Sequence, residues 1–329
     1  MLRALVIAAV AAFASALQAQ EFKPAVVYDL GGKFDGSFNE AAFTGAEKFK
    51  AETGVEYRDF EIQNDSQREQ ALRRFARGGY DPVVAIGFSH ASAMEKVAAE
   101  FPQTRFAIVD SVVDLPNVRS ILFNEHEGSY LVGVLAAMAA GEGDVGFVGG
   151  MDIPLIRKFA CGYVGGAKSM KPDIEVFQNM TGTTGAAWND PAKGGELARS
   201  QIDRGAEVVY HAAGGTGRGV LQAAADAGKL GIGVDSNQNA LHPGKVLTSM
   251  LKRVDVAVFD AFSDAMNDEW SGGARVLGLA EGGVGWALDA NNESLITDAM
   301  KAAVEDASAK IVSGEVVVHD YMADSACPY

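Results

Sequence analysis

Short apolar segments alternate with longer amphipathic segments along most of this 329-residue chain. Apolar runs such as Ala25–Tyr28 and Val83–Ile86 are each followed by a polar or glycine-containing loop and then by apolar residues at helical spacing. A strand–helix–strand rhythm of this kind implies parallel sheets covered by helices on both faces. Because domains usually hold about 100–200 residues, the length predicts two such α/β lobes.

The predicted elements fall into two halves with four or five strands each. Strands are expected at 25–28, 54–57, 83–86 and 105–109 in the first half, and at 145–148, 174–178, 208–211 and 231–234 in the second. Helices are expected at 39–53, 65–79, 90–101, 153–170, 191–203 and 217–228. The apolar stretch 130–140 is about half the ~20 residues needed to cross a bilayer, so we expect a buried helix there.

The N-terminal segment 1–19 has the composition of a secretory signal peptide. Arg3 precedes an apolar stretch over 4–13, and small residues lead to Ala19, where we expect cleavage. The apolar stretch is too short to anchor the chain in a bilayer. No cysteine lies near this point, so no lipid-attachment signal is seen. The mature protein is therefore expected to be periplasmic and soluble.

The charge of the chain argues against two classes of partner. The formal net charge is −15, which repels nucleic acid and anionic membrane surfaces.

The five histidines show no metal-binding spacing, and we expect neither a metal nor a cofactor. We expect a monomer.

Two cysteines, Cys161 and Cys327, leave two alternatives open. An oxidising compartment would allow a disulfide that ties the C-terminal tail to the second lobe. The alternative is one buried thiol and one thiol in the tail, and the count of cysteines does not decide between them.

Polar and aromatic residues follow the predicted strands, at the edge where open parallel sheets bind ligands. These segments are 29–38, 87–90, 110–111, 214–219 and 235–236. The glycine run 214–219 resembles a dinucleotide-binding loop, but after Gly215 and Gly217 the third glycine position holds Val220. We therefore expect the run, Gly214 and Gly215 included, to admit a ligand close to the backbone. Ser89 lies in a turn like that of a hydrolase nucleophile, but Ala91 replaces the second glycine, and a helix cap or a minor ligand contact fits better.

Seven ordered segments resemble the basic membrane protein (BMP) family of substrate-binding proteins of ABC importers, whose characterised members bind purine nucleosides. The first, GGKFDGSFNEAAFTGAEKF at 31–49, and the last, LTSMLKRVDVAVFDAF at 247–262, are the most diagnostic. The others are at 106–111, 124–137, 188–198, 211–224 and 233–238.

The resemblance implies a type I periplasmic-binding-protein fold, in which two doubly wound parallel-sheet lobes are joined by a three-strand hinge. We assign 20–123 plus 246–272 to the N-terminal lobe and 124–245 plus 273–329 to the C-terminal lobe. Partners implied by the resemblance are a purine nucleoside of the adenosine, guanosine or inosine class and an ABC permease in the inner membrane.

The resemblance also implies roles for individual residues. Phe34 matches an aromatic residue that stacks on one face of the purine, and Trp188 stands where the family usually has phenylalanine for the other face. Asn39 matches a side chain that hydrogen-bonds the edge of the base. The polar residues matched to the ribose and base pocket are Asp110, Asp235 and Lys252, and we add Asp35, Ser89 and Gly215 as further contacts. We expect Phe38 to pack beneath the loop rather than to contact the ligand.

Elementary chemistry supports this assignment. Stacking contributes roughly 1–3 kcal/mol per base, and one ring from each lobe would clamp a purine only when the lobes close. A carboxylate can accept hydrogen bonds from both vicinal ribose hydroxyls.

Two alternatives remain: a binding protein for a free purine base or another small polar solute, and a periplasmic nucleoside-processing enzyme. No nucleophile–base pair in the sequence favours the enzyme.

Overall fold

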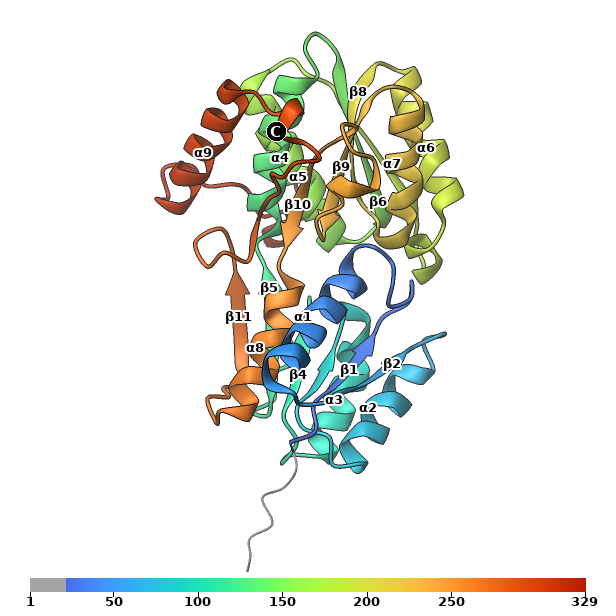
Figure 1. The fold of residues 1–329 in the computed structure, drawn as a ribbon, viewed down its shortest axis with the longest axis vertical. Coiled ribbons are helices and arrows are strands. Elements are labelled where there is room, and N and C mark those ends of the chain that lie inside the picture. The colour runs from blue at the N-terminus through green and yellow to red at the C-terminus, as the bar shows by residue number, and fades with distance from the viewer. Residues whose placement is uncertain (1–21) are drawn as a thin grey trace, which may run out of the picture.

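The computed structural model describes residues 22–329 as two α/β lobes, each built on a six-stranded sheet (Figure 1). The predicted signal peptide lies outside the described residues. The first sheet has the order β11-β5-β4-β3-β1-β2, with β1 (Ala25–Tyr28), β2 (Arg58–Glu61), β3 (Val83–Ala85), β4 (Phe106–Val109), β5 (Val118–Phe123) and β11 (Gly273–Leu277). The second has the order β12-β10-β9-β8-β6-β7, with β6 (Asp144–Met151), β7 (Val176–Gly182), β8 (Ala206–Ala212), β9 (Leu230–Asp235), β10 (Val246–Lys252) and the antiparallel β12 (Val284–Trp286).

Helices cover both faces of each sheet. The first lobe carries α1 (Phe38–Thr53), α2 (Gln67–Arg77), α3 (Ala91–Glu100) and α8 (Val254–Met266). The second carries α4 (Glu125–Ala139), α5 (Pro154–Met170), α6 (Pro191–Asp203), α7 (Gly217–Asp226) and α9 (Asp298–Val312). Among residues 22–329, no helix combines the length and the apolar character needed to cross a membrane. Most residues of the apolar α4 are buried in the second lobe, which confirms the predicted buried helix.

Three inner strands of the first sheet, β1, β3 and β4, are apolar on both faces because both faces are covered. In β1, Val26 and Tyr28 pack toward α1 and α8, whereas Ala25 and Val27 pack toward α2 and α3. Strands buried on both faces read as continuous apolar runs, which is why the sequence predicted them as buried.

The chain crosses between the lobes three times: from β5 to α4, from β10 to α8, and from β11 to β12. Two segments lie in different sheets from those we expected. Residues 246–252 form β10, which pairs with β9 in the second sheet, whereas 273–277 form β11, which pairs with β5 in the first. A strand's sequence does not indicate which of two sheets it joins.

Glycines allow α4 and α5 to pack closely. A Cβ atom at Gly133 would lie 2.3 Å from the carbonyl oxygen of Tyr163, and one at Gly166 would lie 1.9 Å from that of Tyr130. Any side chain at these positions would push the two helices apart. This close packing against α5 holds α4, the helix that follows the first crossover.

The structure joins Cys161 on α5 to Cys327 in the tail, with an S–S distance of 2.11 Å. Of the two alternatives left open by the sequence, the structure therefore has the disulfide. The last residue, Tyr329, packs against Gly165 on the same helix, and its hydroxyl accepts a hydrogen bond from the backbone N–H of His319. The C-terminal tail is thus held on α5 by a covalent bond and by packing.

Candidate functional site

A cavity lies between the lobes at the carboxyl ends of strands from both sheets. In the first lobe, the lining comes from α1 and from residues at the ends of β1 and β4. In the second lobe, it comes from α5 and from residues at the ends of β8 and β9. The lining residues are Asp29, Leu30, Asp35, Phe38, Asn39, Gly87, Phe88, Asp110, Leu155, Ile156, Phe159, Trp188, Ala212, Ala213, Gly214, Val234, Asp235 and Lys252. This is the sheet edge at which the strand pattern placed the site.

Aromatic rings from both lobes line this cavity. Phe38 is the first residue of α1, and Trp188 ends the short helix that precedes α6. The indole of Trp188 lies against the backbone of β6, since a Cβ atom at Gly150 would lie 2.1 Å from its ring. Gly150 therefore leaves room for the indole.

The structure does not place Phe34 in the cavity, which corrects our assignment of the first stacking residue. Its side chain is 60% exposed, and its ring contacts Phe43 edge-on with the centroids 5.2 Å apart. Phe38, which we expected to pack beneath the loop, lines the cavity instead. The two phenylalanines lie four residues apart, on either side of a turn through Gly36, whose φ is 76°.

Lys252 lies at the centre of a buried ionic cluster that forms part of the cavity lining. Its ammonium is 2.7 Å from the Asp110 carboxylate and 2.9 Å from that of Glu125, and the Lys158 ammonium is 3.0 Å from the other oxygen of Glu125. We call Asp110, Glu125, Lys158 and Lys252 the hinge cluster, because Glu125 and Lys252 flank crossovers. Burial lowers the pKa of Lys252, but its carboxylate neighbours outweigh burial and raise it overall, so the side chain stays charged.

Asp110 directly follows β4 and Asp235 ends β9, and both adopt left-handed backbone conformations, with φ of 68° and 63°. Aspartate tolerates this region better than most residues. The Oδ1 atom of Asp110 is buried without a hydrogen-bond partner, and Asp235 accepts a hydrogen bond from the Ser37 hydroxyl of the other lobe. Burial raises the pKa of each aspartate to about 6, while the Lys252 ammonium opposes the shift. Both aspartates line the cavity.

Asn39 and Asp35 line the cavity, but their hydrogen bonds hold the surrounding loop. The Asn39 amide donates to the carbonyl oxygens of Asp29 and Gly32, which uses both of its protons. The Asp35 carboxylate accepts from the backbone N–H groups of Ser37, Asn39 and Glu40 and so caps α1. Burial raises the pKa of Asp35 to about 6, although these N–H groups oppose the shift.

The remaining predicted contacts divide between the cavity and its surroundings. Gly214 lines the cavity, and its φ of 56° suits glycine. Gly215 and Ser89 are not among the lining residues; Gly215 lies beside the Trp188 carbonyl, and Ser89 lies in an adjoining hollow at the edge of the cleft.

Sequence reasoning missed the wall supplied by α5. Leu155, Ile156 and Phe159 occupy the first turns of this helix and line the cavity. Pro154, at the first position of the helix, was a usable signal, because a helix that begins directly after a strand places its first turn at the strand ends. Asp29, also in the lining, is paired with the buried Arg68 and is therefore neutralised. Within residues 22–329, no group of three or more metal-ligating side chains lies together.

Comparison with known proteins identifies the family. Residues 22–321 match the model of the Bmp family, described as "ABC transporter substrate-binding protein PnrA-like". The chain belongs to the Bmp family. It is therefore an ABC transporter substrate-binding protein, and the family and its relatives are binding proteins.

Relatives and solved structures agree with this membership. The chain is 36% identical over 321 residues to the ABC transporter nucleoside-binding protein BmpA of Lactococcus lactis, covering 91% of this chain and 89% of the relative. It is 38% identical over 290 residues to an uncharacterised lipoprotein of Pyrococcus furiosus, covering 83% and 72%. A solute-binding protein of an ABC transporter system from Aeropyrum pernix superposes with a TM-score of 0.83 at 31% identity, covering 91% and 94%. The type I binding-protein fold is thereby confirmed.

Proposed function

We propose that this Bmp-family protein captures a purine nucleoside between its lobes in the periplasm and delivers it to an ABC permease. The single observation that carries the proposal is the pairing of groups in one cavity. A ring from each lobe, Phe38 and Trp188, lies in the same lining as two strand-end carboxylates, Asp110 and Asp235. Aromatic rings suit the faces of a purine, and carboxylates suit vicinal ribose hydroxyls.

The electrostatics of the cavity fit a neutral, hydroxylated ligand. Asp110 and Lys252 already neutralise each other in part, and Asp29 is paired with Arg68. A ligand with hydroxyl donors would satisfy the unpartnered Asp110 Oδ1 without bringing a new charge into a buried site. The name of the Lactococcus relative, a nucleoside-binding protein, supports the same ligand class.

Calorimetric titration of the mature protein tests this proposal. We expect inosine to bind more tightly than hypoxanthine, which lacks the ribose, and ribose alone to bind weakly because it lacks the stacking base. Asp110→Asn should weaken inosine more than hypoxanthine, since only the nucleoside offers hydroxyls to that carboxylate. Equal affinity for inosine and hypoxanthine would favour a free purine base, and binding of neither would overturn the proposal.

A further inference from the structure

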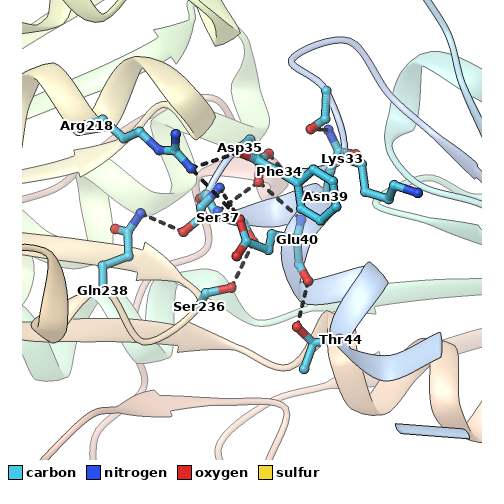
Figure 2. Close-up of polar contacts among 12 residues, drawn as sticks. Lys33, Phe34, Asp35, Ser37, Asn39, Glu40, Thr44, Arg218, Ser236 and Gln238 are labelled. Atoms are coloured by element: carbon cyan, nitrogen blue, oxygen red, sulfur yellow. Dashed lines mark hydrogen bonds and ion pairs between the residues drawn. The ribbon is translucent and has the colours of Figure 1, made fainter. Parts of the chain in front are cut away.

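Three side chains of the second lobe donate hydrogen bonds to main-chain carbonyl oxygens of one loop in the first lobe. Figure 2 shows this loop, which carries Phe34 and Ser37, facing the three donors. The bonds run from Arg218 Nη2 to the oxygen of Phe34 (2.7 Å), from Gln238 Nε2 to that of Gly36 (2.9 Å), and from Ser236 Oγ to that of Ser37 (2.9 Å). All three join groups on opposite lobes, so none can persist when the lobes separate.

The surroundings of Gln238 fix the direction of its amide. Its Oε1 atom accepts a hydrogen bond from the backbone N–H of Val234 (2.9 Å), which can only donate. His211 Nε2 also lies 2.9 Å from this oxygen, and burial lowers the His211 pKa to about 4, so a neutral ring donates from that nitrogen. The Nε2 group of Gln238 must therefore point at Gly36 in the other lobe. Buried groups of the second lobe thus fix this N–H donor in the orientation that reaches the loop.

Arg218 reaches the loop from the first turn of α7 and is about half exposed. Besides its bond to Phe34, its guanidinium lies 3.9 Å from the Glu40 carboxylate on α1. A Cβ atom at Gly36 would lie 2.9 Å from Arg218 Nη2, so the glycine gives the guanidinium room to lie over the loop.

We propose that Arg218, Ser236 and Gln238 are positioning residues that form a closure latch, which holds the lobes together and sets how long the ligand is retained. The loop held by these residues runs directly into Phe38, whose ring lines the cavity, so the latch also fixes one wall of the site. The three donors themselves are absent from the cavity lining and act through the loop. The part of this inference that concerns ligand retention rests on the proposed nucleoside function.

The double variant Arg218→Ala/Ser236→Ala tests the latch. Both substitutions remove a donor outside the cavity, and the Arg218 side chain is half exposed, so the fold should be retained. In small-angle X-ray scattering of the unliganded protein, we expect a larger radius of gyration than for the wild type. In stopped-flow measurements with inosine, we expect the dissociation rate to rise about tenfold with a smaller change in the association rate, because the lost bonds form only after closure.

A matched control is Arg199→Ala/Ser200→Ala on α6, which removes the same two residue types from exposed positions of the same lobe. It should leave both the scattering and the dissociation rate as in the wild type. Gln238→Glu provides an independent variant: it keeps an oxygen for Val234 but loses the donor to Gly36, and it should also speed dissociation.

Two results would overturn the latch. One is an identical radius of gyration for the unliganded wild type and the double variant, which tests closure whether or not a nucleoside is the ligand. The other is inosine dissociation at the same rate from the wild type, the double variant and Gln238→Glu. If inosine does not bind at all, the proposed function fails while the scattering comparison still decides the latch.

Discussion

The hinge cluster and the closure latch both join parts of the two lobes, but they use different interactions. The hinge cluster consists of ionisable side chains that are almost completely buried, with Lys252 between Asp110 and Glu125. The latch consists of three side chains that donate hydrogen bonds to main-chain oxygens, and one of them, Arg218, is half exposed. The acceptors of the latch are neutral main-chain oxygens, whereas the acceptors of Lys252 in the hinge cluster are carboxylates.

This difference follows from what each contact must do during opening. Lys252 and Glu125 lie next to crossovers, where the chain itself keeps the lobes adjacent. Separating buried opposite charges is costly, so a buried ionic cluster suits contacts that persist. A hydrogen bond exchanged for water contributes only about 0.5–1.5 kcal/mol net, so a few such bonds can hold the lobes and still release them. Contacts that persist during opening and contacts that must release are therefore built from different groups in this molecule.

Lys252→Met should have the largest effect, because it removes the cation that faces Asp110 and Glu125. Leaving such charges buried without their partner costs about 3–5 kcal/mol, so we expect the free energy of unfolding to fall by about that amount. Urea denaturation followed by circular dichroism measures the change. The control Lys301→Met removes a lysine from the exposed face of α9, where surface changes stay within about 0.5 kcal/mol. Equal stability of the two variants would show that the hinge cluster does not hold the molecule together.

Phe38→Ala should weaken nucleoside binding by about 1–3 kcal/mol, the range for loss of one stacking partner. Phe34→Ala is its matched control, since the Phe34 ring lies in the same loop but is 60% exposed and outside the cavity. We expect Phe34→Ala to leave the affinity for inosine within about 0.5 kcal/mol of the wild type. Titration calorimetry of both variants separates the two rings, and the opposite ranking would restore Phe34 as the stacking residue.

The smallest effect is expected from pH, and it should act on the carboxylates rather than on the latch. Burial raises the pKa of Asp110 and of Asp235 to about 6. If hydroxyl donors require an ionised carboxylate, the affinity for inosine should fall roughly tenfold from pH 7 to pH 5. The scattering difference between the wild type and the latch variant should not change over this range, because the acceptors of the latch are main-chain carbonyl oxygens rather than carboxylates.

The same shifts give the opposite sign for stability without ligand. A carboxyl whose folded-state pKa is raised contributes stability at low pH that is lost as pH rises through about 6. The stability of the wild type relative to Asp235→Asn should therefore increase from pH 7 to pH 5 while affinity decreases. Thermal unfolding of both proteins at the two pH values measures this. A wild type that loses stability relative to Asp235→Asn on acidification would show that Asp235 is not held in a charge-disfavouring site.

Much of the fold could be predicted from the sequence, because strands buried on both faces and amphipathic helices leave clear patterns. The helix at 191–203 was predicted with the bounds that the structure gives to α6. The sheet membership of β10 and β11 could not be predicted, since either sheet can bury the same apolar strand. The edge strand β12 and helix α9 were also missed, because short or surface elements carry weaker patterns.

The site was predictable in location but not in every residue. The strand-end rule led to Asp110 and Asp235, and the family resemblance added Trp188 and Lys252, all of which line the cavity. The choice between Phe34 and Phe38 depended on the path of one glycine-containing loop, which the sequence leaves undetermined. The latch could not be predicted from the sequence either. Its acceptors are main-chain oxygens, which every residue has, so no side-chain pattern marks them.

Mass spectrometry of the ligand released from protein purified without unfolding tests the central claim most directly. The protein is denatured after purification, and the small molecules set free are compared with those from the Trp188→Ala variant prepared in parallel. We predict a purine nucleoside in the wild-type sample and a strongly reduced amount from the variant. Release of a sugar, an amino acid or another compound without a purine, in stoichiometric amounts, would contradict the account.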